Sequence, residues 1–121
     1  MKTCLVVDDS SVIRKVARRI LERLEFDISE AEDGLQAIAR CERGLPDVVL
    51  LDAAMPNMDG YEFLRALRRM PGGDRPKVIL CQVENDLAQT ARARHAGADD
   101  ILLKPFGKEH VEARFAAAGL L

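Results

Sequence analysis

The chain has 121 residues, of which 48% are hydrophobic and 31% charged, and its 18 basic and 20 acidic residues leave a net charge of −2. This length and composition predict one soluble globular domain that buries a core without disulfides or structural metal, and they exclude a disordered chain. The near-balance of charge gives no reason to expect binding to DNA or to a membrane surface. We expect a single domain over residues 1–121 with no output domain.

The three cysteines, Cys4, Cys41 and Cys81, are an odd set within apolar segments, with no CxxC pair and no histidine cluster at metal-ligand spacing. They are typical of small core residues in a reducing compartment. No apolar stretch approaches the length that a bilayer requires, and the first apolar run ends in two acids. The sequence therefore predicts a cytoplasmic protein that is neither secreted nor inserted in a membrane.

Strand and helix patterns alternate along the chain. An apolar run at residues 4–7 stops at Asp8 and Asp9, and apolar residues then recur at helical spacing over 12–24. Further strands are expected at 27–32, 47–52, 77–82 and 101–103, and further helices at 35–43, 61–69, 87–95 and 108–118. Three helix starts carry an N-cap with a partner three residues later: Asp33 with Gln36, Asp59 with Glu62, and Asp86 with Gln89.

Alternating strands and helices, with strands apolar on both faces, predict an α/β fold with a parallel sheet covered by helices on each side. We expect five strands in the order 2-1-3-4-5 with five helices, a doubly wound, flavodoxin-like arrangement. Ligands of such sheets bind beyond the carboxyl ends of the strands. The polar residues at strand ends are therefore the candidates for function.

Five polar residues end four of the expected strands: Asp8 and Asp9, Asp52, Gln82, and Lys104. On a parallel sheet these ends converge on one edge, where three carboxylates repel one another unless a cation lies among them. Oxygen ligands of this kind suit Mg²⁺, which keeps water and phosphate oxygens in its shell. Asp52, on the central strand, is the best candidate nucleophile, and Lys104 can stabilise a new phosphate charge.

Each residue also has an ordinary structural explanation. Asp9 would cap the first helix, Asp52 would open the turn that runs through Pro56 and Gly60, and Lys104 would be a surface charge. Their joint placement at strand ends favours the functional interpretation.

Three segments carry a family resemblance: VVDDSSVIRK, VVLLDAAMPNMDGYEFL and AGADDILLKPF. They resemble the signature segments of response-regulator receiver domains, and the match covers essentially the whole chain. MPNMDG after the candidate nucleophile and KPF after the last strand are most similar to stand-alone CheY-like chemotaxis regulators. A chance match of this order and spacing is very unusual.

The resemblance implies a set of roles. Asp8, Asp9, Asp52 and the backbone carbonyl of Ala54 would bind Mg²⁺ or Mn²⁺, and a histidine kinase or phosphotransfer protein would phosphorylate Asp52. Lys104, Gln82 and Val83 would contact the phosphate, and the Lys104–Pro105 bond would be cis. The methyl side chain of Ala54 excludes any role of a polar residue there in positioning water for dephosphorylation.

The chain departs from the family pattern at two positions. Receiver domains ordinarily carry Ser or Thr where this chain has Gln82, whose longer amide can still donate a hydrogen bond. Ile101 occupies the switch position, where many receivers have an aromatic residue that rotates inward, and a β-branched side chain cannot reproduce that movement. We favour an ordinary core role for Ile101, and these two departures put output coupling in doubt.

Basic residues gather on three helices. Arg14, Lys15 and Arg18 belong to a first-helix patch that would dock an acidic phosphotransfer domain, although a solvated helix face is the simpler interpretation. The same solvated interpretation applies to Arg65, Arg68 and Arg69. Arg92 and Arg94 suggest a nucleotide second messenger, an idea that we do not favour because the chain has no glycine-rich phosphate loop.

Three functions compete. The leading hypothesis is a two-component response regulator that acts, in chemotaxis or motility, through phosphorylation-dependent binding to a protein such as a flagellar motor component. The alternative is a non-switching receiver that serves as a phosphate sink or scaffold. An aspartyl-phosphate phosphatase or mutase would need a second acid soon after Asp52, but Ala53 and Ala54 follow it, so we do not expect an enzyme.

Overall fold

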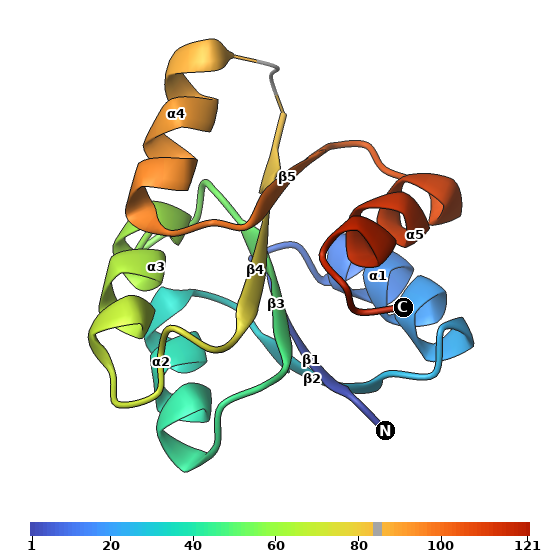
Figure 1. Ribbon diagram of the computed structural model, residues 1–121, viewed down its shortest axis with the longest axis horizontal. Helices are drawn as coiled ribbons and strands as arrows, with labels where there is room; N and C mark the ends of the chain where they lie inside the picture. Colours follow the sequence, from blue (N-terminus) through green and yellow to red (C-terminus); the bar gives the residue numbers. More distant parts are fainter. Residues whose placement is uncertain (84–85) are drawn as a thin grey trace.

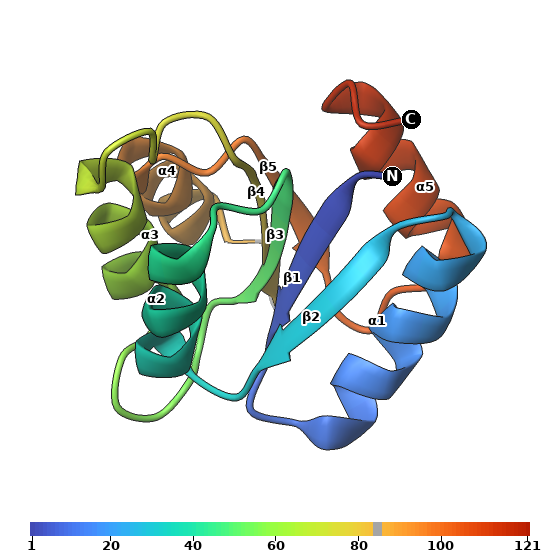
Figure 2. The same ribbon diagram turned by 90° about the horizontal axis from the view of Figure 1, so that it is seen from below.

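The computed structural model describes residues 1–83 and 86–121 as one sheet with a layer of helices on each face (Figures 1 and 2). The strands are β1 (Thr3–Val7), β2 (Asp27–Ala31), β3 (Val48–Asp52), β4 (Lys77–Gln82) and β5 (Asp100–Leu103). The helices are α1 (Ser11–Arg23), α2 (Gly34–Arg43), α3 (Gly60–Arg69), α4 (Leu87–Ala96) and α5 (Lys108–Ala117). Every boundary expected from the sequence lies within one residue of the observed one.

All strand pairs are parallel, and the order is β2-β1-β3-β4-β5, which confirms the predicted doubly wound fold. Helices α1 and α5 cover one face of the sheet, and α2, α3 and α4 cover the other (Figure 2). The order reverses between β1 and β3, so the carboxyl ends of these two neighbours form the switch point of the sheet.

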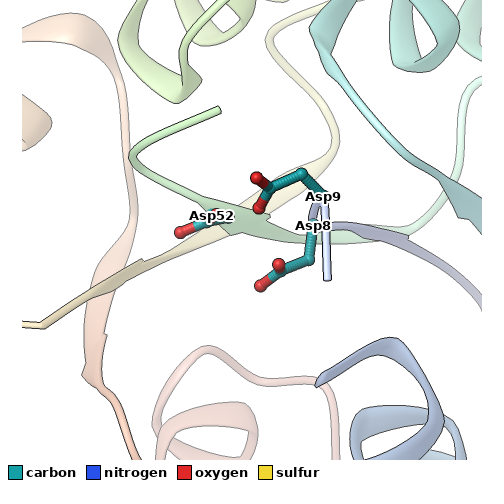
Figure 3. Close-up of side chains that lie close together, drawn as sticks. All are labelled: Asp8, Asp9 and Asp52. Carbon is teal, nitrogen blue, oxygen red and sulfur yellow. The ribbon is translucent and has the colours of Figure 1, made fainter. Parts of the chain in front are cut away.

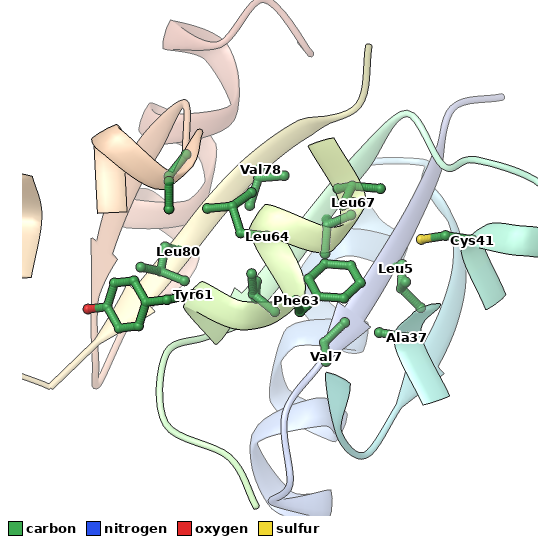
Figure 4. Packing of buried hydrophobic residues seen from close by; sticks show 14 of the residues in the cluster. Leu5, Val7, Ala37, Cys41, Tyr61, Phe63, Leu64, Leu67, Val78 and Leu80 are labelled. Atoms are coloured by element: carbon green, nitrogen blue, oxygen red, sulfur yellow. The ribbon is translucent and has the colours of Figure 1, made fainter. Parts of the chain in front are cut away.

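The core has two halves because successive strand residues point to opposite faces. Leu5 and Val7 of β1 pack under α2 and α3 with Phe63 and Leu67 (Figure 4), whereas Cys4 and Val6 pack on the side of α1 and α5. All residues of β3 are buried, as expected for a central parallel strand. Cys4, Cys41 and Cys81 are buried free thiols, which confirms their expected core role.

Helix caps follow the prediction only in part. Asp59 forms the complete reciprocal box with Glu62 at the start of α3. Asp33 accepts from the backbone N–H of Gln36. The Gln36 side chain, however, accepts from the backbone N–H of Glu32 and not from that of Asp33. Asp86 accepts from Ala88 and Gln89. The suggestion that Asp9 caps α1 is wrong, because Ser10 is the N-cap and accepts from Ile13 at 3.3 Å.

Arg68 corrects a second expectation, because its guanidinium does not extend into solvent. It donates to the carbonyl oxygens of Gly97, Gly73 and Pro76 at distances of 2.7–3.1 Å and pairs with Asp99. It therefore fastens the end of α4 and the loop before β4 to α3. None of the helices within residues 1–83 and 86–121 combines the length and the hydrophobicity that a membrane span requires.

Candidate functional site

Three acids meet at the switch point of the sheet (Figure 3). Asp8 and Asp9 follow β1, Asp52 ends β3, and oxygen atoms of the three carboxylates lie within 4.8 Å of one another. Asp8 and Asp52 are buried, with 3% and 7% exposed, whereas Asp9 is open to solvent. The strand ends thus bring together the three carboxylates that the sequence predicts as metal ligands.

Lys104 lies at the same edge, just beyond β5. Its Nζ donates to Asp8 Oδ2 at 2.7 Å and to Asp52 Oδ1 at 3.1 Å. The Lys104 backbone N–H donates to the Gln82 carbonyl at 2.8 Å, and the Lys104–Pro105 peptide bond is cis. The ammonium therefore neutralises part of the charge that the clustered carboxylates create.

The surroundings at this edge shift the pKa values of Asp52 and Lys104. Burial raises the pKa of the Asp52 carboxyl, the charge of Asp8 raises it further, and Lys104 and the Ala54 amide oppose that rise only partly. Burial lowers the pKa of Lys104, but its hydrogen bonds to Asp8 and Asp52 more than compensate, so the net pKa is raised. The protein alone thus disfavours the charged form of Asp52 relative to water.

The main chain after β3 holds Asp52 in place. The Ala53 N–H donates to the Cys81 carbonyl, and the Gly60 N–H donates to the Ala53 carbonyl, both at 3.0 Å. A Cβ atom on Gly60 would collide with the Asp52 carbonyl oxygen, so only glycine allows this close approach. The turn from Asp52 to α3 is consequently fixed at both ends.

The exposed side of the edge can admit a ligand. Asp9, Ala54 and Arg92 line an open cleft of about 490 Å³ beside Asp52. Carboxylate and carbonyl oxygens are suitable ligands for a hard divalent cation, and this donor set fits Mg²⁺ or Mn²⁺ better than a softer metal. The arrangement suits phosphoryl chemistry at Asp52, because a cation and the Lys104 ammonium would both stabilise phosphate charge.

The remaining predicted site residues differ in their surroundings. Gln82 is 2% exposed, and its Nε2 donates to Tyr61 Oη at 3.2 Å, a contact that the sequence reasoning missed. Val83 is 76% exposed at the same end of β4. Ile101 is half-buried and packs against the core cluster under α2 and α3.

The basic residues are mostly engaged within the fold. Arg14 donates to Glu30 and to the Asp8 carbonyl, and Arg18 also pairs with Glu30, while Lys15 is exposed. The Arg92 guanidinium stacks on the Tyr61 ring, with Cζ 3.9 Å from the ring centroid. Arg94 lies 3.7 Å from Asp100. Arg92 is thus held against Tyr61, whereas Arg94 remains exposed beside Asp100.

Comparison with known proteins gives a consistent result. The model of the response regulator receiver domain family matches residues 4–116. The response regulator MprA of a Mycobacterium species (strain KMS) is 36% identical over 113 residues, which are 93% of this chain and 48% of MprA. The chain thus spans about half the length of this curated relative.

Solved structures support the same assignment. The chemotaxis protein CheY4 of Vibrio cholerae has a TM-score of 0.92 at 28% identity, covering 97% of this chain and 98% of CheY4. The receiver domain of the sensor histidine kinase PA1611 of Pseudomonas aeruginosa has a TM-score of 0.88 at 28% identity, covering 96% of this chain and 95% of that domain. That structure has a magnesium ion coordinated in its active-site cleft.

Proposed function

Because the chain belongs to the family of response regulator receiver domains, we propose that it is a two-component signalling domain phosphorylated on Asp52. The observation that carries this proposal is the position of the buried Asp52 carboxylate between two further acids and the Lys104 ammonium. Asp8, Asp9 and the Ala54 carbonyl would bind Mg²⁺ or Mn²⁺ with Asp52. When bound, the cation would neutralise charge on the transferred phosphoryl group.

The chain's own residues would act as follows. An Asp52 oxygen attacks the phosphorus of a phosphohistidine on a kinase or phosphotransfer protein, so a P–O bond forms and a P–N bond breaks. The electron pair of the broken bond stays on the imidazole, which takes a proton from solvent. Lys104, already 3.1 Å from Asp52, follows the growing charge and donates to a phosphate oxygen.

For the output, we propose phosphorylation-dependent binding to a partner protein. The end-to-end similarity to CheY4 supports a role in chemotaxis or motility, with a flagellar motor component as the kind of partner. The departures at Gln82 and Ile101 support the alternative, a phosphate sink or scaffold whose partner binding does not respond to phosphorylation.

The test is to incubate the protein with acetyl phosphate and Mg²⁺ and to measure its mass. We expect a gain of one phosphoryl group that disappears without divalent metal and in Asp52→Asn. The matched control is Asp74→Asn, which removes an exposed acid from the loop before β4 and should leave the gain intact. If wild type gains no mass, or if Asp52→Asn gains as much as wild type, Asp52 is not the phosphoacceptor.

A further inference from the structure

Three side chains from three different elements meet beside the acidic edge. Gln82 ends β4, Tyr61 lies in the first turn of α3, and Arg92 lies in α4. The Gln82 amide donates to the Tyr61 hydroxyl at 3.2 Å, and Arg92 stacks on the Tyr61 ring. Figure 4 shows the Tyr61 hydroxyl directed away from the buried cluster to which the ring belongs. A continuous path therefore runs from the end of β4 to α4.

Both ends of the Gln82–Tyr61 hydrogen bond are attached to the residues that hold Asp52. Gln82 follows Cys81, which is the register partner of Asp52, and its carbonyl accepts from the backbone of Lys104. Tyr61 follows Gly60, which packs on the Asp52 carbonyl. A change at Asp52 consequently reaches this pair through backbone contacts on two sides.

The Gln82 amide is only half satisfied. Among the residues that the structure describes, its Oε1 is buried without a hydrogen-bond partner, whereas Nε2 is paired. A buried acceptor without a donor is unfavourable, and such atoms are uncommon in folded proteins. The terminal torsion of glutamine is broad and roughly two-fold, so the amide can reverse without moving the rest of the side chain.

Reversal would satisfy the amide completely once a phosphate is present. Oε1 would accept from the Tyr61 hydroxyl, and Nε2 would become a donor for an acceptor arriving on the other side. A phosphoryl group on Asp52 supplies strong acceptor oxygens at the adjacent strand end. The Tyr61 hydroxyl would then change from acceptor to donor.

We propose that Gln82, Tyr61 and Arg92 form a relay through which phosphorylation of Asp52 reaches α4, with Tyr61 as the aromatic coupling residue in place of position 101. This inference rests on the proposed function, because it requires phosphorylation of Asp52. Gln82 transmits the change by reversing its amide, and the ring contact with Arg92 carries the change to α4. Tyr61 and Arg92 both line the cleft beside Asp52, and the role assigned to them here is coupling, with no part in the chemical step.

The composition of the chain supplies the test. Tyr61 is its single tyrosine and there is no tryptophan, so intrinsic fluorescence reports on this one ring. The protein is titrated with acetyl phosphate in Mg²⁺, and the fluorescence change is normalised to the phosphorylated fraction found by mass. We expect a change in wild type that is absent in Asp52→Asn, together with shifts of the backbone amide resonances of Ala93 and Ala96.

Variants separate the steps of the relay. Gln82→Met keeps the length of the side chain but removes the amide, so the normalised fluorescence change should be lost. Tyr61→Phe keeps the ring and should still be phosphorylated, but the α4 amide shifts should disappear. Arg92→Gln should lose the α4 shifts while keeping the fluorescence change, and Arg94→Gln, on the same helix, should keep both.

The outcomes distinguish the relay from the function on which it rests. A wild type that gains phosphate without any change in Tyr61 fluorescence would overturn the relay and leave the proposed function standing. A full fluorescence change in Gln82→Met at equal phosphorylation would also overturn it. No mass gain in wild type would overturn the proposed function and the relay together.

Discussion

Helices α3 and α4 have the same length of ten residues but are attached to the fold in different ways. Helix α3 buries four large side chains, Tyr61, Phe63, Leu64 and Leu67. Helix α4 buries only Ala93 and Ala96, and its first residue, Leu87, is 86% exposed. The burial of apolar area, and with it the hydrophobic contribution to stability, is therefore much larger for α3.

Hydrogen bonds at the two ends of α4 attach it to the fold, because its face buries little apolar area. Asp86 caps the start, and the Gly97 carbonyl at the other end accepts two hydrogen bonds from Arg68 of α3. A helix held mainly at its ends opens locally at a lower free energy than one held by a buried face. We therefore expect α3 to be the more stable of the two helices and α4 to open locally at a lower free energy.

The strongest way to break this comparison is to delete core contacts of α3. Phe63→Ala should lower the free energy of unfolding by about 3–5 kcal/mol, because the Phe63 ring is fully buried. Leu87→Ala, the matched change on α4, should stay within about 0.5 kcal/mol of wild type. Urea denaturation measures both values. Similar costs for the two variants would contradict the comparison.

Divalent metal should slow the hydrogen exchange of α3 but not that of α4. Mg²⁺ at about a hundred times its dissociation constant should raise the global stability by about 2.7 kcal/mol. Amides of α3 that exchange only by global unfolding should then slow, while α4 amides that exchange by local opening should not. Hydrogen exchange with and without Mg²⁺ tests this. Equal slowing in both helices would show that α4 does not open independently.

Removing the hydrogen bonds of Arg68 tests how the C-terminal end of α4 is held. Arg68→Met should cost about 1–3 kcal/mol, because it leaves the carbonyls of Gly97, Gly73 and Pro76 without their donor. Exchange at the C-terminal end of α4 should accelerate more than exchange in α3. The control is Arg69→Met, at an exposed neighbouring position. If Arg69→Met has the same effect, these hydrogen bonds do not hold α4.

The smallest expected effect concerns charge at the acidic edge. The raised pKa of Asp52 means that the folded chain binds this proton more tightly than the unfolded chain, so stability falls as pH rises from the ordinary carboxyl value of 3.8 through the raised pKa. Without metal, Asp52→Asn should therefore be more stable than wild type at neutral pH. The gain should be less than about 1 kcal/mol, because water screens the partly open site.

Thermal unfolding in chelator across a pH series checks this sign. The advantage of Asp52→Asn should disappear once the pH falls below the ordinary carboxyl value of 3.8. An Asp52→Asn variant that is less stable than wild type at neutral pH would show that the Lys104 contact outweighs burial and the charge of Asp8.

Most of the fold could be predicted because its signals are local. The apolar strands, the periodic helices and the acids at strand ends lie within short segments, and the parallel topology follows from their alternation. Asp8, Asp9, Asp52 and Lys104 could be grouped for the same reason, since each ends a strand or lies within two residues of its end.

The missed contacts depend on packing between distant segments. An arginine on a helix looks the same in sequence whether it extends into water or, like Arg68, donates to carbonyls far along the chain. The contact between Tyr61 and Gln82 depends on how α3 sits against β4, which no local pattern encodes. Ser10 and not Asp9 caps α1, because the helix begins at Ser11. A difference of one residue in where a helix begins decides which side chain reaches the N–H groups of its first turn.

The reactivity of the three buried cysteines can report on local opening of the fold. Burial raises the pKa of Cys4 to about 12 and that of Cys41 to about 11, and it also raises that of Cys81, so almost no thiolate is present at neutral pH. Alkylating reagents should therefore modify these sulfurs only when the surrounding elements separate. Cys81, the register partner of Asp52, would report on the central sheet, whereas Cys41 of α2 would report on the helical layer.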